Sequence, residues 1–269
     1  MKTGLFRIIS VCAMNFLLNY LLLFPLGLFQ YIHTPDLKMF GLVGLVVSGT
    51  TAIATVLFYR LVDRKKIRTL GFRMNKKDLL FSLTSIVVTV LLVMYVVMIG
   101  SEREVISAEW NLEVLSEGSF YSLFVLVFAT WFISALYEEI LFRGYFVANL
   151  HFLTKKKLYT LSSVIFMIFH IFKGLDLISI ILLMVMGGVF LYVYLKSGSL
   201  LPGTFAHLIF NLATSHLVGN SEIALLTYSG DLGVFQLIII AFYLFITIFL
   251  TNIFYPQTVS STIKENLHS

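Results

Sequence analysis

The sequence predicts an all-α, polytopic membrane protein built as a bundle of eight transmembrane helices. Of its 269 residues, 59% are hydrophobic and only 12% are charged. Uncharged runs of about 20 residues, the length that crosses a bilayer, recur along the chain. Each run is expected to be helical because lipid offers the backbone no hydrogen-bond partners. The connections between runs are short, so we expect one integral membrane domain over residues 1–269 and no separate soluble domain.

The eight predicted spans follow the apolar runs in order. The first is too long for a secretory signal and is followed by further spans, so we interpret it as a membrane helix. We find no internal repeat. The expected spans are residues 7–29, 39–59, 79–100, 119–150, 158–173, 176–195, 200–218 and 233–255.

The distribution of charge gives these spans a direction. Lysine and arginine gather before the first span and after the second, fourth and sixth, whereas glutamates dominate after the third. With eight spans every basic cluster falls on one side, which the positive-inside rule makes cytoplasmic. Both termini then lie in the cytoplasm, in a membrane that we expect to be a bacterial plasma membrane. The net charge of +5 therefore indicates orientation in a bilayer and no nucleic-acid partner.

Two further features bear on structure. Residues 60–78 form either a basic amphipathic helix on anionic lipid or a solvated positive loop, and we favour the loop. The single Cys12 excludes an internal disulfide and a cysteine-based metal cluster.

Charged residues inside an apolar tract mark the candidate site. Glu138, Glu139 and Arg143 interrupt the run from Phe120 to about Leu153, and charges within a membrane helix are functional candidates by default. On a helix Glu139 and Arg143 are one turn apart and can pair. Glu138 points about 100° away around the axis, so that pairing leaves it available.

Two other spans carry polar residues at a depth that matches that of Glu138. With a rise of about 1.5 Å per residue, Glu138 lies roughly 18 Å from a helix end near residue 150, and His170 is similarly deep from a start near 158. His207 and Asn211 lie one turn apart on one helix face, roughly 10–16 Å from a start near 200. We therefore expect these side chains to meet in the cytoplasmic half of the bundle.

This set suits hydrolysis of a peptide bond. Amide cleavage by water needs a base for the water proton, donors for the oxyanion and an acid for the leaving amine. A desolvated Glu138 is a stronger base, and His170 could share or orient the water. His207 and Asn211 could donate hydrogen bonds to the oxyanion.

Other interpretations remain open at this level. Glu138 and Glu139 could be a juxtamembrane pair, although apolar sequence continues beyond them. Singly, each histidine is more often a buried residue bonded to a carbonyl, and Asn211 more often joins helices. We interpret His216 as interfacial and Gly187-Gly188 as a site of close helix packing.

Taken together, Glu138-Glu139-x-x-x-Arg143, Phe166-x-x-x-His170 and His207-x-x-x-Asn211 resemble the three signature motifs of the CPBP family. This family contains the type II CAAX prenyl endopeptidase and bacteriocin-processing and immunity proteins, and is also named Abi. The resemblance covers residues 119–218, which we take as the catalytic core.

The resemblance implies an eight-helix intramembrane endopeptidase with a site open to the cytoplasm. It implies that Glu138 activates water with His170, that His207 and Asn211 form the oxyanion hole, and that Glu139 and Arg143 shape the site. The partners would be the lipid bilayer and a membrane-associated peptide or protein substrate. The alternative is a non-catalytic immunity or scaffold protein of the same fold. A small transporter is a third reading, but it predicts inverted repeats that we do not find.

The cofactor requirement has two readings. Glu138, His170 and His207 could hold zinc with water as the fourth ligand. No HExxH motif is present, and Asn211 is a poor zinc ligand but a good donor. We therefore favour no cofactor, with zinc as the alternative.

Overall fold

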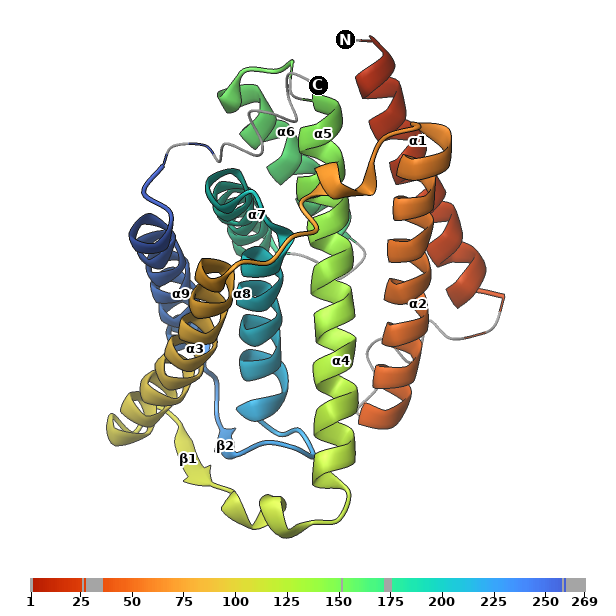
Figure 1. Cartoon of the computed structure of the whole chain (residues 1–269). Helices are drawn as coiled ribbons and strands as arrows, with labels where there is room; N and C mark the ends of the chain where they lie inside the picture. Colours follow the sequence, from red (N-terminus) through yellow and green to blue (C-terminus); the bar gives the residue numbers. More distant parts are fainter. Residues whose placement is uncertain are drawn as a thin grey trace.

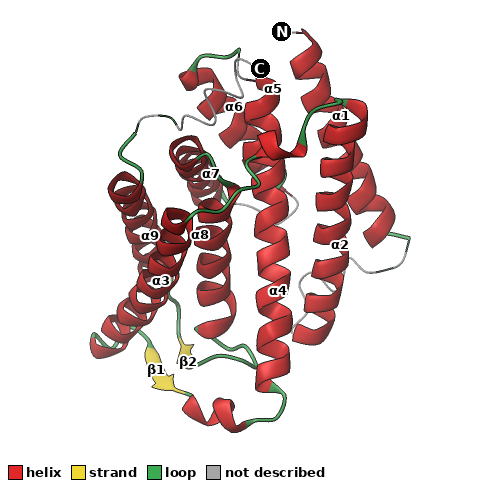
Figure 2. Ribbon diagram, viewed as in Figure 1, coloured by secondary structure: helices red, strands yellow, loops and turns green. Residues whose placement is uncertain are grey.

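The computed structural model describes residues 2–25, 27, 36–150, 152–171, 176–257 and 259, and it is a bundle of helices with one small pair of strands (Figures 1 and 2). The α-helices are α1 (Lys2–Leu23), α2 (Leu37–Leu57), α3 (Lys76–Glu102), α4 (Phe120–Glu139), α5 (Phe146–Leu150), α6 (Lys155–Ile168), α7 (Leu177–Ser197), α8 (Leu200–Leu212) and α9 (Gly233–Phe254). Short π-helical or 3-10 segments are η2 (Phe58–Val62), η3 (Ile67–Leu70), η4 (Leu112–Ser116), η5 (Ile140–Tyr145) and η7 (Ala213–Leu217), and the strands are β1 (Ser107–Trp110) and β2 (Leu226–Ser229).

Six helical stretches of the described chain are long and apolar enough to cross a membrane. They correspond to six of the eight predicted spans. They are Gly4–Leu23, Leu37–Val62, Lys76–Glu102, Phe120–Leu150, Leu177–Ser197 and Gly233–Phe254. The multi-pass helical membrane fold is therefore confirmed, whereas the count of eight spans, which needs α6 and α8 as well, stays a prediction.

The helix at the fifth predicted span is shorter than a membrane crossing needs. Helix α6 has 14 residues, from Lys155 to Ile168, and is about 21 Å long, less than the roughly 30 Å hydrocarbon core. It begins earlier than predicted because the Thr154 hydroxyl accepts a hydrogen bond from the Lys157 amide, which places the three lysines in its first turn. It ends before His170, and residues 172–173 of the prediction lie outside the described residues.

Other boundaries shift as well. Helix α1 ends at Leu23, six residues before the predicted end, and residues 26, 28 and 29 lie outside the described part. Helix α4 continues through η5 into α5, so the chain is helical from Phe120 to Leu150. The helix does not stop at Glu138 and Glu139, and the interpretation of these residues as the end of a span is wrong.

The basic segment between α2 and α3 is not an amphipathic helix. Residues 67–70 form the 3-10 turn η3, and residues 71–75 have no regular structure. Its backbone is bound to the end of α7 and the start of α8. Tyr194 Oη donates to Leu70 O at 3.1 Å, Leu200 N donates to Gly71 O at 3.1 Å, and the Arg73 guanidinium donates to Ser197 O. These bonds fix the segment across the bundle, where Figure 1 shows it passing in front of α4 and α8.

The basic parts of the chain gather at this same end. Lys65 Nζ, just after η2, donates to Ala148 O in α5 at 2.6 Å, and Arg7 Nε of α1 lies 3.1 Å from Asp63 Oδ1. Beyond α9, Gln257 Nε2 donates to Lys196 O at 2.7 Å. These contacts place the starts or ends of five helices on one side, as the alternating directions of the predicted spans require.

The opposite end carries a feature that we did not predict. Strands β1 and β2 pair antiparallel, with Ser107 opposite Ser229 and Trp110 opposite Leu226. Each has only four residues, and they are brought together by helices far apart in the sequence. Such short segments give no clear strand pattern, so only the folded chain reveals them.

Close packing at small residues sets the helix spacing near the site. A Cβ on Gly187 would lie 3.1 Å from Ser163 Cα, and one on Gly144 would lie 2.7 Å from Leu70 O. The first contact lets α6 and α7 approach, as predicted for Gly187-Gly188, and the second presses the basic segment onto η5.

Candidate active site

A fully buried ion pair forms the base of the site. Arg143 Nη1 lies 3.2 Å from Glu139 Oε1, and both side chains are completely buried. The Arg143 guanidinium carbon also lies 4.7 Å from the Phe166 ring centre and 5.2 Å from that of Phe190. Aromatic faces stabilise a desolvated cation. The Glu139 carboxylate and the two aromatic rings together stabilise the Arg143 cation in the interior of the bundle.

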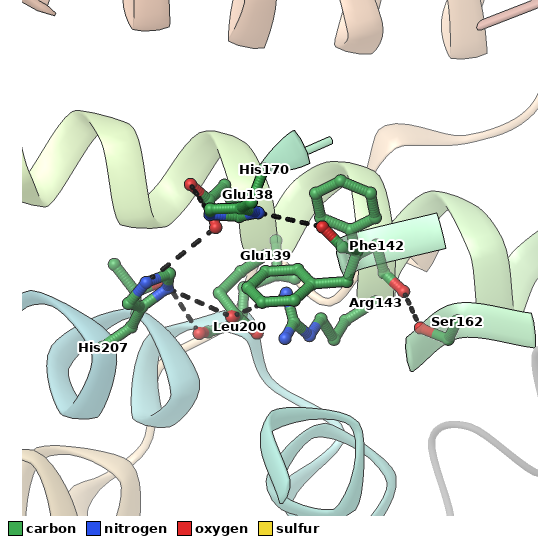
Figure 3. A network of polar contacts seen from close by, with 10 residues as sticks. Glu138, Glu139, Phe142, Arg143, Ser162, His170, Leu200 and His207 are labelled. Carbon is green, nitrogen blue, oxygen red and sulfur yellow. Dashed lines mark hydrogen bonds and ion pairs between the residues drawn. The ribbon is translucent and has the colours of Figure 1, made fainter. Parts of the chain in front are cut away.

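The pair sits where the helix changes its hydrogen-bonding pattern. Glu139 is the last residue of α4, and Arg143 lies in the π-helical segment η5. Single π turns inside α-helices often occur at functional sites. The carbonyl of Phe142, in this segment, accepts a hydrogen bond from Ser162 Oγ of α6 at 3.1 Å (Figure 3). This bond satisfies a carbonyl in η5 and joins it to the helix that leads to His170.

Glycine lets α8 reach Glu139. A Cβ on Gly203 would lie only 2.7 Å from Glu139 Oε2. The sequence analysis did not identify Gly203, although a glycine inside a helical pattern is a signal of close approach. The glycine does not reveal which group approaches it.

His170 lies just beyond α6 and is held by the last turn of that helix. Its Nδ1 lies 2.9 Å from Phe166 O, one turn earlier. A carbonyl oxygen only accepts, so Nδ1 carries the proton of this bond. The other nitrogen, Nε2, faces Glu138 Oε1 at 3.9 Å (Figure 3).

His207 lies between the two carboxylates. Its ring stacks on Phe190, with centres 4.8 Å apart and planes at 23°. Nε2 is 3.8 Å from Glu138 Oε2, and Nδ1 is 3.9 Å from Glu139 Oε1 (Figure 3). The stacking fixes the plane in which the ring presents its two nitrogens to Glu138 and Glu139.

Glu138 and Glu139 are neighbours in sequence but lie in different environments. The side chain of Glu138 is 16% exposed, whereas that of Glu139 is fully buried. Glu139 faces Arg143 and Gly203, while Glu138 faces the two histidines. The structure thus separates one fully enclosed carboxylate from one that is partly exposed.

Asn211 is the one predicted site residue for which the described contacts give no bond to the other five. It lies in α8, one turn beyond His207, and its side chain is half-buried. The structure therefore joins Glu138, Glu139, Arg143, His170 and His207 in one network, and places Asn211 next to that network along the helix.

His216 lies at the end of α8, and its interfacial position in the membrane stays a prediction. Its side chain is buried in η7, with its ring centre 5.3 Å from that of Phe40 and 6.0 Å from that of Trp131. The π turn at the end of α8 directs it inward between α2 and α4. Position near a helix end alone does not decide burial.

The residues considered for zinc are close but do not form a recognisable metal site. Within the described ranges, no group of three or more His, Cys, Asp or Glu side chains is arranged to hold a metal ion. Glu138 instead stands between the two histidines at nearly equal distances. Whether the reaction uses a metal stays a prediction.

The fold and the site together define a multi-pass membrane protein with a buried cluster of carboxylates, histidines and one arginine. Residues 120–213 match the family model described as type II CAAX prenyl endopeptidase Rce1-like. This range holds every residue predicted for the site, so the match confirms the resemblance to the CPBP family and points to a protease. No curated protein and no solved structure matches the chain.

Proposed function

We propose that the chain is an intramembrane endopeptidase that hydrolyses a peptide bond of a membrane-associated protein or peptide. The observation that carries this proposal is the position of the Glu138 carboxylate, which lies 3.9 Å from His170 Nε2 and 3.8 Å from His207 Nε2. The match to type II CAAX prenyl endopeptidases supports a protease with a membrane-associated substrate.

The proposed nucleophile is a water molecule held between Glu138 and His170. With its proton on Nδ1, a neutral His170 presents an acceptor at Nε2, and an ionised Glu138 presents a second acceptor. A water molecule between these two acceptors, which lie 3.9 Å apart, can donate one proton to each of them. Its remaining lone pair is then free to attack a carbonyl carbon.

Proton transfer completes the reaction. Glu138 takes one water proton as hydroxide adds to the peptide carbonyl, and it returns that proton to the leaving nitrogen as the C–N bond breaks. The products are a carboxylic acid and an amine. The partial exposure of Glu138 suits a group that has to meet water and substrate.

His207 and Asn211 are proposed to stabilise the oxyanion. With His207 doubly protonated, its charge and that of Arg143 balance the two glutamates, and Nε2–H faces Glu138. The Glu139 carboxylate lies 3.9 Å from Nδ1 of the same ring. Asn211, one turn away, offers a carboxamide N–H to the same oxygen. Preorganised donors of this kind are a large term in acyl-transfer catalysis.

We propose that the reaction is metal-independent. In this scheme each of the four residues has a role that needs no metal ion. The purified enzyme should carry no stoichiometric zinc and should cleave after exhaustive treatment with a chelator that reaches the cavity. Loss of activity on chelation, with recovery on added zinc, would make Glu138, His170 and His207 the first candidate ligands.

The proposed orientation places the basic end in the cytoplasm, with eight crossings and both termini inside. Reporter fusions after Lys66 and Lys156 should report the cytoplasm, and a fusion after Glu109 should report the outside. An external signal from the Lys155–Lys157 turn would contradict both the orientation and the cytoplasmic opening of the site.

The central experiment compares membranes that contain the wild type or Glu138→Gln. The amide keeps the shape of the side chain but cannot accept the water proton, so peptide products made by the wild type should be missing while protein abundance is unchanged. Glu102→Gln, an exposed glutamate outside the site, is the matched control. Full biological activity of Glu138→Gln at normal abundance would favour the non-catalytic scaffold.

A further inference from the structure

The basic strip, defined as residues 64–77, exposes two kinds of side chain at once. Its exposed cations are Arg64, Lys66, Arg68, Lys76 and Lys77. Between them, the apolar side chains of Ile67, Phe72 and Met74 are exposed as well. Cations and apolar groups that share one exposed segment at the end of a transmembrane bundle suit the boundary between lipid headgroups and acyl chains.

The cations of the strip divide into two groups. Lys65 and Arg73 turn inward and donate to backbone carbonyls of Ala148 and Ser197. In contrast, the structure records no hydrogen bond or ion pair within its described residues for the side chains of the exposed cations Arg68, Lys76 and Lys77. The first group contributes to the stability of the fold, whereas the second group is exposed at the surface.

An apolar groove opens beside the strip. It has a volume of about 260 Å³, and its walls come from the strip, from α4 and from the start of α8. Its lining residues are Gly71, Phe72, Arg73, Leu136, Leu200 and Leu201. Since Leu136 belongs to a membrane-spanning stretch and Arg73 to the basic strip, the groove runs from the headgroup level towards the acyl-chain level.

The electrostatic character of the groove is positive at one end. Helix α3 begins at Lys76 and helix α8 begins at Leu200, so the positive ends of two helix dipoles face this region. Arg73 stands at the wall between them. The leucines deeper in the groove offer only apolar contact.

We propose that this strip and groove bind an anionic phospholipid, with the phosphate on the cations of the strip and one acyl chain in the groove. Charge complementarity selects an anionic headgroup, because each lysine or arginine near an anionic surface strengthens attraction by roughly five-fold. The apolar walls select a lipid over a soluble phosphate, which has no group to fill them. The proposal does not depend on the proposed peptidase activity.

The bound lipid would act on elements that hold the candidate site. Leu70 O packs against Gly144 in η5, and Gly71 O accepts from the first amide of α8. Because a ligand stabilises the state that binds it, the lipid should stabilise the strip against η5 and α8. Thermal unfolding therefore reports binding without any measurement of catalysis.

The test uses the full chain in nanodiscs of phosphatidylcholine, with or without phosphatidylglycerol. Phosphatidylglycerol should raise the unfolding temperature of the wild type, and native mass spectrometry should find it retained in preference to phosphatidylcholine. The triple variant Arg68→Gln, Lys76→Gln and Lys77→Gln should lose at least about ten-fold in apparent phosphatidylglycerol affinity. Leu201→Trp, which fills the groove without changing charge, should lower retention as well.

The matched control removes the same charge from the same end of the bundle. Lys155→Gln, Lys156→Gln and Lys157→Gln neutralise three exposed lysines of α6 and should leave the effect of phosphatidylglycerol intact. An equal loss in this control would show general surface attraction and overturn the site. Equal stabilisation by phosphatidylcholine, or by inorganic phosphate alone, would overturn the anionic phospholipid as the occupant.

Discussion

The two ion pairs Glu139–Arg143 and Arg7–Asp63 have almost the same length but different surroundings. Their N–O distances are 3.2 and 3.1 Å. Both partners of the first pair are fully buried, whereas in the second pair the Asp63 side chain is fully buried and the Arg7 side chain is 35% exposed. The strength of an ion pair is thus set less by its distance than by what replaces water around each charge.

The inner pair is enclosed by aromatic rings, and the outer pair lies among other polar groups. Near the outer pair, Tyr145 Oη donates to Arg7 O at 3.3 Å. Burial, together with the charge of Arg7, lowers the pKa of Lys65, while Asp63 acts in the opposite direction. The outer pair therefore belongs to a network that shares its charges and joins α1 to the bundle. In the inner pair Arg143 Nη1 lies closer to Glu139 than His207 Nδ1 does, at 3.2 Å against 3.9 Å, so we expect each member of the pair to depend mainly on the other.

The largest effect is expected from Arg143→Ala. It leaves Glu139 buried without its partner, and breaking a buried pair in this way commonly costs about 3–5 kcal/mol. Unfolding in detergent and abundance in the membrane should both show the loss. The double variant Glu139→Ala with Arg143→Ala should recover part of it. A stable Arg143→Ala beside an unstable Glu139→Ala would contradict the interdependence of the pair.

His207→Ala tests whether the residue that links the inner pair to Glu138 contributes to catalysis. His207 Nδ1 faces Glu139 while Nε2 faces Glu138, so its loss should lower turnover by about 10²–10³, as for one oxyanion donor. Asn211→Ala should lower turnover similarly, whereas His170→Ala and Glu138→Ala should abolish it. Protein abundance should stay normal in all four. An unchanged turnover in His207→Ala would contradict the proposal that His207 stabilises the oxyanion.

Gly203→Ala tests the inner pair from another side, because it should displace the Glu139 side chain. The new methyl group would meet Glu139 Oε2 at 2.7 Å, and overpacking of this kind costs about 1–3 kcal/mol. Alanine is intrinsically better than glycine in a helix by about 1 kcal/mol, so a net loss would measure the strain. Gly118→Ala, where nothing lies within 4 Å of the added Cβ, is the control and should be close to neutral.

The smallest effect is expected from Arg7→Ala. Because Arg7 is partly exposed and Lys65 remains near the buried Asp63 carboxylate, the loss should be smaller than the roughly 3–5 kcal/mol of a pair buried on both sides. Unfolding in the same detergent as Arg143→Ala gives the direct comparison. A loss as large as that of Arg143→Ala would show that exposure does not separate the two pairs.

Much of the fold and of the candidate site was predicted from local sequence patterns. The length of apolar runs predicted the six stretches that can cross a membrane, because lipid requires a helix wherever the chain remains apolar. The spacing of Glu139 and Arg143 predicted their pairing, which depends only on neighbouring turns of one helix. Counting along three helices placed Glu138, His170 and His207 near one level, and the structure brings these three together.

Contacts between distant segments decided the rest. The sequence by itself determined the class of fold, the ion pair and the residues of the candidate site, since these follow from hydrophobicity and helical spacing. Only the tertiary structure decided that α6 stops short of His170, that His216 is buried, that β1 pairs with β2, and that Gly203 admits a carboxylate. Each of these depends on which surface a residue meets across the bundle, and helical periodicity within one segment does not contain that information.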